Sequence, residues 1–187
     1  MDTIERVKKI ILSPKTEWQV IDTEEISVSK LLTSYLVILA MIPAIGWFIG
    51  YGLVGHNVPG IHMGIINFAI RQAVISFLGT IGSAFLTAYI INWLAPRFGS
   101  KEDFNRAFRL VVYSYTPMCV AGILYIFPAL SSLAGVVGLY SLYILYLGIA
   151  PMMKTPEEKI TTYFLSTIIF VILIFLLISM ILGGLYF

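Results

Sequence analysis

Five long runs of apolar residues alternate with short polar segments along the chain. A transmembrane helix needs roughly 20 apolar residues, because it rises about 1.5 Å per residue and the hydrocarbon core of a bilayer is about 30 Å thick. None of the five runs contains an acidic or basic residue. The pattern therefore predicts five membrane-spanning helices, at about residues 31–54, 73–94, 110–127, 129–150 and 163–186.

The weakest boundary lies between the third and fourth runs, where Pro128, Ser131 and Ser132 are the only interruptions. A single helix through this uncharged stretch of about 40 residues would reach about 60 Å, which is twice the hydrocarbon thickness. We therefore expect a tight hairpin of two helices at this place.

The segment before the first run has a different pattern. Aliphatic residues recur at helical spacing opposite charged ones, namely Ile4, Val7, Ile10 and Ile11 against Glu5, Lys8 and Lys9. This spacing is typical of an amphipathic helix that lies on a membrane surface, and the helix should stop near Ser13 and Pro14. Trp18 would then settle at the interface as an aromatic anchor. The alternative is a loosely ordered tail.

Composition and charge place the five helices in a membrane and orient them. With 59% apolar and 12% charged residues, a chain of 187 residues has more apolar surface than a soluble domain buries. Cytoplasmic loops next to membrane spans are enriched in Lys and Arg. In the predicted arrangement Arg71 alone lies on one side, and the eleven other basic residues lie on the opposite side: Arg6, Lys8, Lys9, Lys15, Lys30, Arg97, Lys101, Arg106, Arg109, Lys154 and Lys159.

The expected fold class is all-α. It is a polytopic membrane bundle of five transmembrane helices, with the N-terminus cytoplasmic and the C-terminus outside, preceded by the short amphipathic interfacial helix. Residues 1–30 would form a cytoplasmic interfacial segment and residues 31–187 the transmembrane domain. The third helix should begin before its apolar core, because Ser100 to Asp103 have the spacing of a capping box. On that extension Arg106 and Arg109 are expected to point toward lipid headgroups.

The chain offers little for catalysis. It contains no HExxH, GxSxG or GxxxxGK[ST] motif and no pair of carboxylates at membrane depth. His56 and His62 form an incomplete set of metal ligands, and the single Cys119 lies inside the third span. We therefore expect no enzymatic activity, no cofactor and no metal. Acidic residues nearly balance the basic side, so no nucleic-acid partner is expected either.

Small residues and prolines occur within the spans. Pairs of small residues four positions apart, which let two helices approach closely, occur at Gly46 and Gly50, Gly79 and Ser83, and Ala134 and Gly138. They would serve either helix packing within one chain or a homo-oligomer, and the sequence leaves both open. Pro43 and Pro117 should kink the first and third helices.

Tyrosines are dense on the third and fourth helices. They are Tyr113, Tyr115 and Tyr125 on the third helix, and Tyr140, Tyr143 and Tyr146 on roughly one face of the fourth. Facing each other, the two sets would form a hydrogen-bonded seam. Alternatively, they would line a polar crevice that reaches Thr116 from the cytoplasm.

Several short motifs follow one another in a characteristic order around the five spans. They are Pro14, Trp18, Ile21 and Glu24, then Tyr113, Tyr115, Thr116 and Pro117, then the run from Gly138 through Gly148 to Ile149, followed by Lys154 and Pro156. In this order the chain resembles a short prokaryotic member of the Yip1 domain family over nearly its whole length. The resemblance implies five helices and a cytoplasmic N-terminus. Eukaryotic relatives are linked to vesicle traffic and small prenylated GTPases through a longer N-terminal region, so that activity is not expected here.

The function expected from these features is non-enzymatic. We expect a multi-pass protein of the cytoplasmic membrane that acts as a helical scaffold, binding protein partners on its cytoplasmic face or organising membrane lipid. The spans hold no charged group at membrane depth, which disfavours ion-coupled transport. An uncoupled transporter, channel or lipid-moving protein is the alternative.

Overall fold

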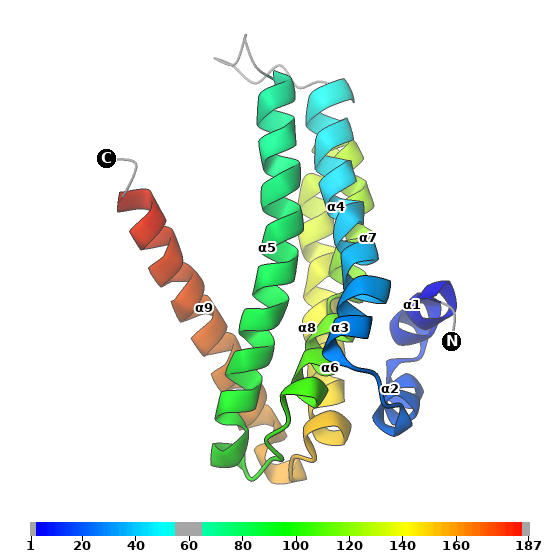
Figure 1. The fold of residues 1–187 in the computed structure, drawn as a ribbon, viewed down its shortest axis with the longest axis vertical. Coiled ribbons are helices and arrows are strands. Elements are labelled where there is room, and N and C mark those ends of the chain that lie inside the picture. The colour runs from blue at the N-terminus through cyan, green and yellow to red at the C-terminus, as the bar shows by residue number, and fades with distance from the viewer. Residues whose placement is uncertain (1–2, 55–64, 185–187) are drawn as a thin grey trace.

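The computed structural model describes residues 3–54 and 65–184, and the regular secondary structure in these ranges is helical throughout (Figure 1). Within them, five helical segments are long and apolar enough to cross a membrane: Val28–Val54, Ile66–Phe98, Phe104–Ile126, Ser131–Met153 and Glu157–Met180. The prediction of five long apolar helices is confirmed.

The segments are built from the following elements. The first comprises α3 (Val28–Leu31) and α4 (Val37–Ile49), with π-helical turns over Leu32–Leu36 and Gly50–Val54. The second is α5 (Ile65–Leu94) with a 3₁₀ turn over Ala95–Phe98, and the third is α6 (Phe104–Ser114), α7 (Thr116–Ala121) and a 3₁₀ segment over Gly122–Ile126. The fourth is α8 (Ser131–Met153), and the fifth is α9 (Ile160–Gly184) after a 3₁₀ turn over Glu157–Lys159. Two short helices precede them, α1 (Thr3–Leu12) and α2 (Pro14–Thr23).

The second span begins earlier than the apolar pattern predicted, at Ile65 instead of Ala73. Polar residues such as Gln72 interrupt the apolar run but are compatible with a helix, so the helix continues through them. The Arg71 guanidinium lies 5.8 Å from the centroid of the Phe68 ring, where it gains a cation–π contact. The apolar run therefore marks the lipid-like part of the helix and not its end.

The third and fourth spans form the predicted hairpin. The Phe127 N–H donates to the Leu124 carbonyl at 3.1 Å, and the Leu130 N–H donates to the Phe127 carbonyl at 2.7 Å. The third span is interrupted just before Pro117, between α6 and α7. The Met118 N–H next to this break donates to the Ser141 hydroxyl of α8 at 3.1 Å, so the neighbouring helix satisfies it.

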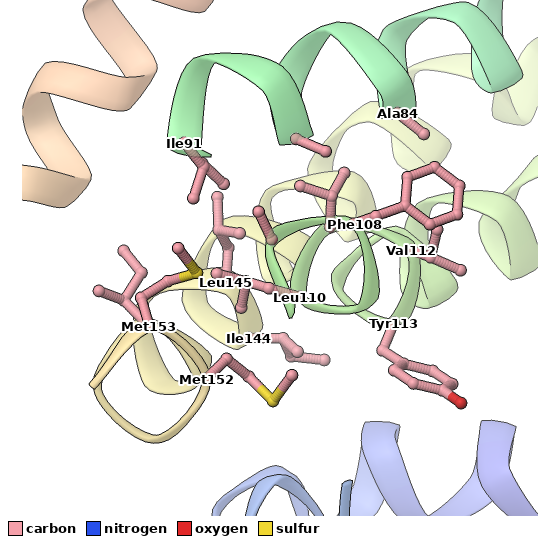
Figure 2. Packing of buried hydrophobic residues seen from close by; sticks show 14 of the residues in the cluster. Ala84, Ile91, Phe108, Leu110, Val112, Tyr113, Ile144, Leu145, Met152 and Met153 are labelled. Carbon is pink, nitrogen blue, oxygen red and sulfur yellow. The ribbon is translucent and has the colours of Figure 1, made fainter. Parts of the chain in front are cut away.

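The centre of the bundle is an apolar cluster between α5, α6 and α8 (Figure 2). Ile91, Phe108 and Ile144 supply it from these three helices, and each is completely buried. In Figure 1, α9 stands apart from the other spans toward its C-terminal end. The Tyr163 hydroxyl near its start donates to the Ile91 carbonyl at 2.5 Å. The apolar residues on the rest of α9 are largely exposed, as expected for a helix that faces lipid.

Two glycines bring α4 into backbone contact with the end of the third span. A Cβ atom added at Gly46 would lie 2.4 Å from the Gly122 carbonyl oxygen, and one added at Gly50 would lie 2.0 Å from the Tyr125 carbonyl oxygen. Real Cβ atoms do not approach that closely, so this packing within one chain requires glycine. In a membrane, such close approach is a main source of helix association.

The other small pairs have different surroundings. Ala134 is buried, and a Cβ atom at Gly138 would lie 3.7 Å from the Met118 Cγ, an ordinary contact. At Gly79 an added Cβ atom would have no described atom within 4 Å, and the Ser83 hydroxyl donates to a carbonyl of its own helix. Within the described part of the chain, α5 is thus open at Gly79, whereas Ser83 is half-buried.

We expect Gly50→Ala to destabilise the detergent-solubilised protein by about 1–3 kcal/mol, because the new methyl group must displace the Tyr125 backbone. The matched variant Gly79→Ala adds the same methyl group where no described atom lies within 4 Å. It should leave stability unchanged or raise it by up to about 1 kcal/mol through helix propensity. Thermal unfolding followed by circular dichroism compares the two variants, and equal effects would contradict the close approach of α4.

Candidate functional site

The two N-terminal helices α1 and α2, here called the N-terminal cap, lie beside α3 and the adjoining part of the bundle (Figure 1). α2 packs along α8, and α1 reaches α7. Ile10 of α1 and Ile21 of α2 are completely buried, whereas Ile4 remains exposed. The aliphatic face that predicted α1 therefore covers protein as well as facing outward. The end of the bundle that carries the cap, with the starts of α3 and α6 and the end of α8, is called the cap end below.

Trp18 anchors the cap in a notch of α8. Its Nε1–H donates to the Ile144 carbonyl at 3.0 Å, and the side chain is almost completely buried. A Cβ atom added at Gly148 would lie 2.5 Å from the indole Cε2, so the glycine makes room for the ring. Trp18 is therefore an internal anchor, and the expectation that it settles at the membrane interface is wrong. The interface and a protein surface both favour an aromatic ring with one polar atom, so composition did not separate them.

A buried ion-pair network joins α1 to α2 and to the link before α3. The Arg6 guanidinium contacts Glu17 Oε1 at 2.5 Å and also pairs with Glu24 Oε1, and it lies 5.4 Å from the centroid of the Tyr113 ring. The Arg6 and Glu17 side chains are only 5% and 4% exposed. Burial alone would lower the pKa of Arg6, but the hydrogen bond to Glu24 and the nearby negative charges outweigh it and raise that pKa. The guanidinium is therefore held in its charged form.

A second ionic cluster connects α2 to α6 and to the residue after α8. Asp22 accepts hydrogen bonds from Arg106 and, at 2.6 Å, from Lys154. Burial would raise the pKa of Asp22, but these two hydrogen bonds outweigh it and hold the pKa below its ordinary value. Arg106 also donates to the Met152 carbonyl at 2.5 Å. Arg106 thus faces the last turn of α8 and not lipid headgroups, contrary to the expectation.

Arg109 is likewise turned into the protein. It is 5% exposed, and its guanidinium donates to the carbonyls of Ile21, at 3.2 Å, and of Glu24. These carbonyls belong to the end of α2 and to the link that follows it, so Arg109 satisfies backbone groups that the helix leaves free. The prediction that Arg109 points toward headgroups is wrong, because α6 is buried around almost its whole circumference between α5, α8 and α3, and Arg109 is bonded to the end of α2.

Most of the motif residues singled out from the sequence meet at this junction. Pro14 is buried at the start of α2, and the Tyr140 hydroxyl donates to the Ile11 carbonyl at 2.9 Å. Tyr143 stacks on Tyr140, with 5.6 Å between ring centroids, and remains partly exposed. Together with Trp18, Glu24, Tyr113 and Gly148, these residues surround the contact between the cap and the bundle.

Three motif residues lie deeper. The Thr116 hydroxyl is completely buried and bonds to the Tyr35 hydroxyl at 2.9 Å, and Pro117 beside it is buried. The Tyr115 hydroxyl bonds to Thr87 of α5 at 3.1 Å, on the other side of α6 from the cap. Because Tyr115, Tyr140 and the half-buried Tyr146 contact three different elements, the tyrosines do not form the single seam expected from their spacing.

The junction carries charged residues that the sequence showed only as part of a charged surface. Arg6 precedes Ile10 by four positions, and Glu17 precedes Ile21 by four, so each shares a helix face with a buried aliphatic residue. A charge on the apolar face is a signal of an internal ion pair. The prediction about His56 and His62 lies outside the described residues, and the described part of the chain has no group of three metal-ligating side chains.

We expect Arg6→Ala to loosen the N-terminal cap, because it leaves Glu17 buried without its partner, at a cost of about 3–5 kcal/mol. Hydrogen exchange of the α1 and α2 amides should accelerate, while the central helices stay protected. The control is Lys9→Ala, which removes an exposed ion pair with Glu5, worth about 0.5 kcal/mol or less. Equal exchange in wild type and Arg6→Ala would show that the network does not hold the cap.

Comparison with known proteins identifies the family. The model of the Yip1 domain family matches residues 8–180. The inner membrane protein YohC of Escherichia coli K12 is 26% identical over 188 residues, which cover 91% of this chain and 92% of that protein, and the same protein of Escherichia coli O6:H1 matches equally. No solved structure matches significantly. The expected location in the cytoplasmic membrane is confirmed by these relatives and the five apolar helices. The chain is a multi-pass membrane protein that belongs to the Yip1 domain family.

Proposed function

We propose that this protein is a non-enzymatic scaffold of the cytoplasmic membrane, whose N-terminal cap presents a fixed surface to protein partners and to lipid. The observation that carries the proposal is the attachment of the cap. The ion pairs of Arg6 join α1 to α2 and to the link before α3, whereas Asp22 joins α2 to Arg106 of α6 and to Lys154, and the buried Trp18 joins α2 to α8. Short isolated helices are marginal in water, so this attachment gives them a defined position and orientation.

The cap end faces the cytoplasm in this proposal. Eleven of the twelve basic residues belong to the cap, to α3, or to segments at the cap ends of the later spans, and Arg71 lies near the start of α5 instead. Cytoplasmic segments next to membrane spans are enriched in Lys and Arg, which supports an N-terminus inside. With five spans, the C-terminus then lies outside.

The outer face of the cap has two kinds of residue. Lys8, Lys15 and Gln19 are exposed polar groups suited to a protein partner. Ile4 and Leu12, at 64% and 78% exposure, are apolar groups suited to the boundary between lipid headgroups and acyl chains. The cap therefore offers a surface where a partner can bind while remaining next to lipid.

Close packing at the middle of the bundle favours a scaffold over an uncoupled transport path. The Thr116 hydroxyl is bonded to Tyr35, and Leu36 and Cys119 in the same region are at most 1% exposed. A polar hollow of about 350 Å³ does enter from the cap end as far as Tyr35 and Tyr113, and this hollow is what favours the alternative of a solute or lipid path. Thr116 is not part of its lining.

The proposed orientation predicts which ends react with a membrane-impermeant thiol reagent. In a Cys119→Ser background, Lys8→Cys should be labelled only after the cytoplasmic membrane is permeabilised. Val54→Cys, at the opposite end of the first span, should be labelled in intact cells. Mass shift of the protein on gels measures both, and the reverse pattern would overturn the orientation.

The scaffold role predicts contacts at the cap and no transport. A photo-crosslinking amino acid replacing Gln19, on the exposed face of α2, should give discrete protein adducts in intact cells, which Arg6→Ala should reduce severalfold by loosening the cap. The same probe replacing Tyr89, exposed on α5, is the lipid-facing control.

Proteoliposomes provide the second half of the test. The purified protein should raise neither solute flux nor lipid scrambling above that of empty vesicles. Flux that is clear in wild type and disappears with Pro117→Ala or Tyr143→Phe would establish the transport alternative and refute the scaffold.

A further inference from the structure

A second polar hollow lies at the cap end, between the link from α2 to α3 and the start of α6. It has a volume of about 470 Å³, within the range of about 300–1,000 Å³ usual for small-molecule sites. Its lining is almost entirely polar: Asp22, Thr23, Glu24, Glu25, Ile26, Ser27, Lys101, Asp103, Asn105, Arg106 and Arg109. The Arg106 and Asp22 side chains already pair with each other, so the other polar residues of the lining are the candidates to bind a ligand.

Three buried atoms that belong to the lining residues have no hydrogen-bond partner: Arg109 Nε, Asn105 Oδ1 and Glu24 Oε2. Arg109 is only 5% exposed, and no ion pair joins it to a described carboxylate. Leaving such groups unpaired is unfavourable, and native proteins do so rarely. The residues that line the hollow thus carry one buried donor and two buried acceptors without partners in the described part of the chain.

The identity of these atoms specifies the chemistry of a ligand. Arg109 Nε requires an acceptor, and an anionic oxygen suits a guanidinium best. Glu24 Oε2 and Asn105 Oδ1 require N–H or O–H donors, and a carboxylate prefers a cationic one. The charges of the lining are nearly balanced, with four acidic and three basic side chains, so a ligand with a large net charge is disfavoured.

We infer that this hollow binds a phosphoethanolamine group, with the phosphate toward Arg109 and Lys101 and the primary ammonium toward Glu24 and Asn105. Its position indicates the source. The hollow lies where the first and third candidate spans begin, at Val28 and Phe104, and the ends of a membrane span lie near the membrane surface. The headgroup of phosphatidylethanolamine supplies a phosphoethanolamine group at that level. The inference rests on the proposed function only in placing the cap end at the membrane surface.

Native mass spectrometry of the full-length protein in detergent tests the inference. Phosphatidylethanolamine should bind about five- to tenfold more tightly than phosphatidylcholine, whose quaternary ammonium has no N–H, and than anionic phosphatidylglycerol. Asn105→Ala should reduce the preference to near unity without removing a bond that Asn105 Oδ1 accepts. Asn92→Ala is the matched control, since its Oδ1 is also buried without a partner but lies on α5, away from the hollow.

A second variant and a soluble arm complete the experiment. Glu24→Gln removes the negative charge and should also weaken phosphatidylethanolamine binding severalfold. Glycerophosphoethanolamine competing at the concentration of the lipid would identify a soluble ligand of the same chemistry, whereas much weaker competition would identify the lipid. Equal binding of the three lipids, or an unchanged preference in Asn105→Ala with a normal thermal unfolding curve, would overturn the inference. Crosslinking from the cap would be unaffected by that result, so its failure is separate from that of the scaffold role.

Discussion

Burial of the Arg6 guanidinium is the constraint on which the cap end of this protein depends. A charged group removed from water requires full compensation, and Glu17 and Glu24 supply it from two different segments. Glu17 lies on α2 and Glu24 on the link to α3, so one side chain fixes the angle between α1 and α2 and the entry of the chain into the first span. The Tyr113 ring beneath Arg6 extends the same contact into α6.

The two ends of the bundle are held together by different forces. Toward the ends of α4 and the third span, Gly46 and Gly50 allow backbone contact, and dispersion forces between close helices act without any hydrophobic driving force from water. At the cap end, carboxylates and guanidinium groups act in a partly dry setting, where each bond is stronger and each unpaired atom is more costly. Trp18 combines close packing at a glycine with a polar bond, since Gly148 accommodates its ring and the Ile144 carbonyl accepts a hydrogen bond from its N–H.

The sequence predicted the five spans because hydrocarbon imposes a length and an exclusion of charge that leave a plain pattern. It predicted the hairpin at Pro128 because the alternative helix would be too long. It did not predict the start of α5, since Arg71 is compatible with a helix whether or not hydrocarbon surrounds it. The surroundings of Trp18 and Arg109 were also missed. Helical spacing shows which residues share a face, but at a membrane surface both lipid and another helix accept the same amphipathic face, and tertiary contacts alone decide between them.

The energetics of the cap bear on how it can act. Detaching it would break the Asp22 pairs with Arg106 and Lys154 and withdraw the buried Trp18 side chain from α8, and the loss of a buried Trp side chain from a core costs about 3–5 kcal/mol. A detached form would therefore be populated at about one part in a hundred to one in several thousand, and a partner that required it would need a correspondingly greater affinity for that form. A partner that binds the outer face of the attached cap meets no such penalty. Recognition of the attached cap therefore has the lower free-energy cost. In that case the ion pairs on the inner face of the cap determine which surface its outer face presents to a partner.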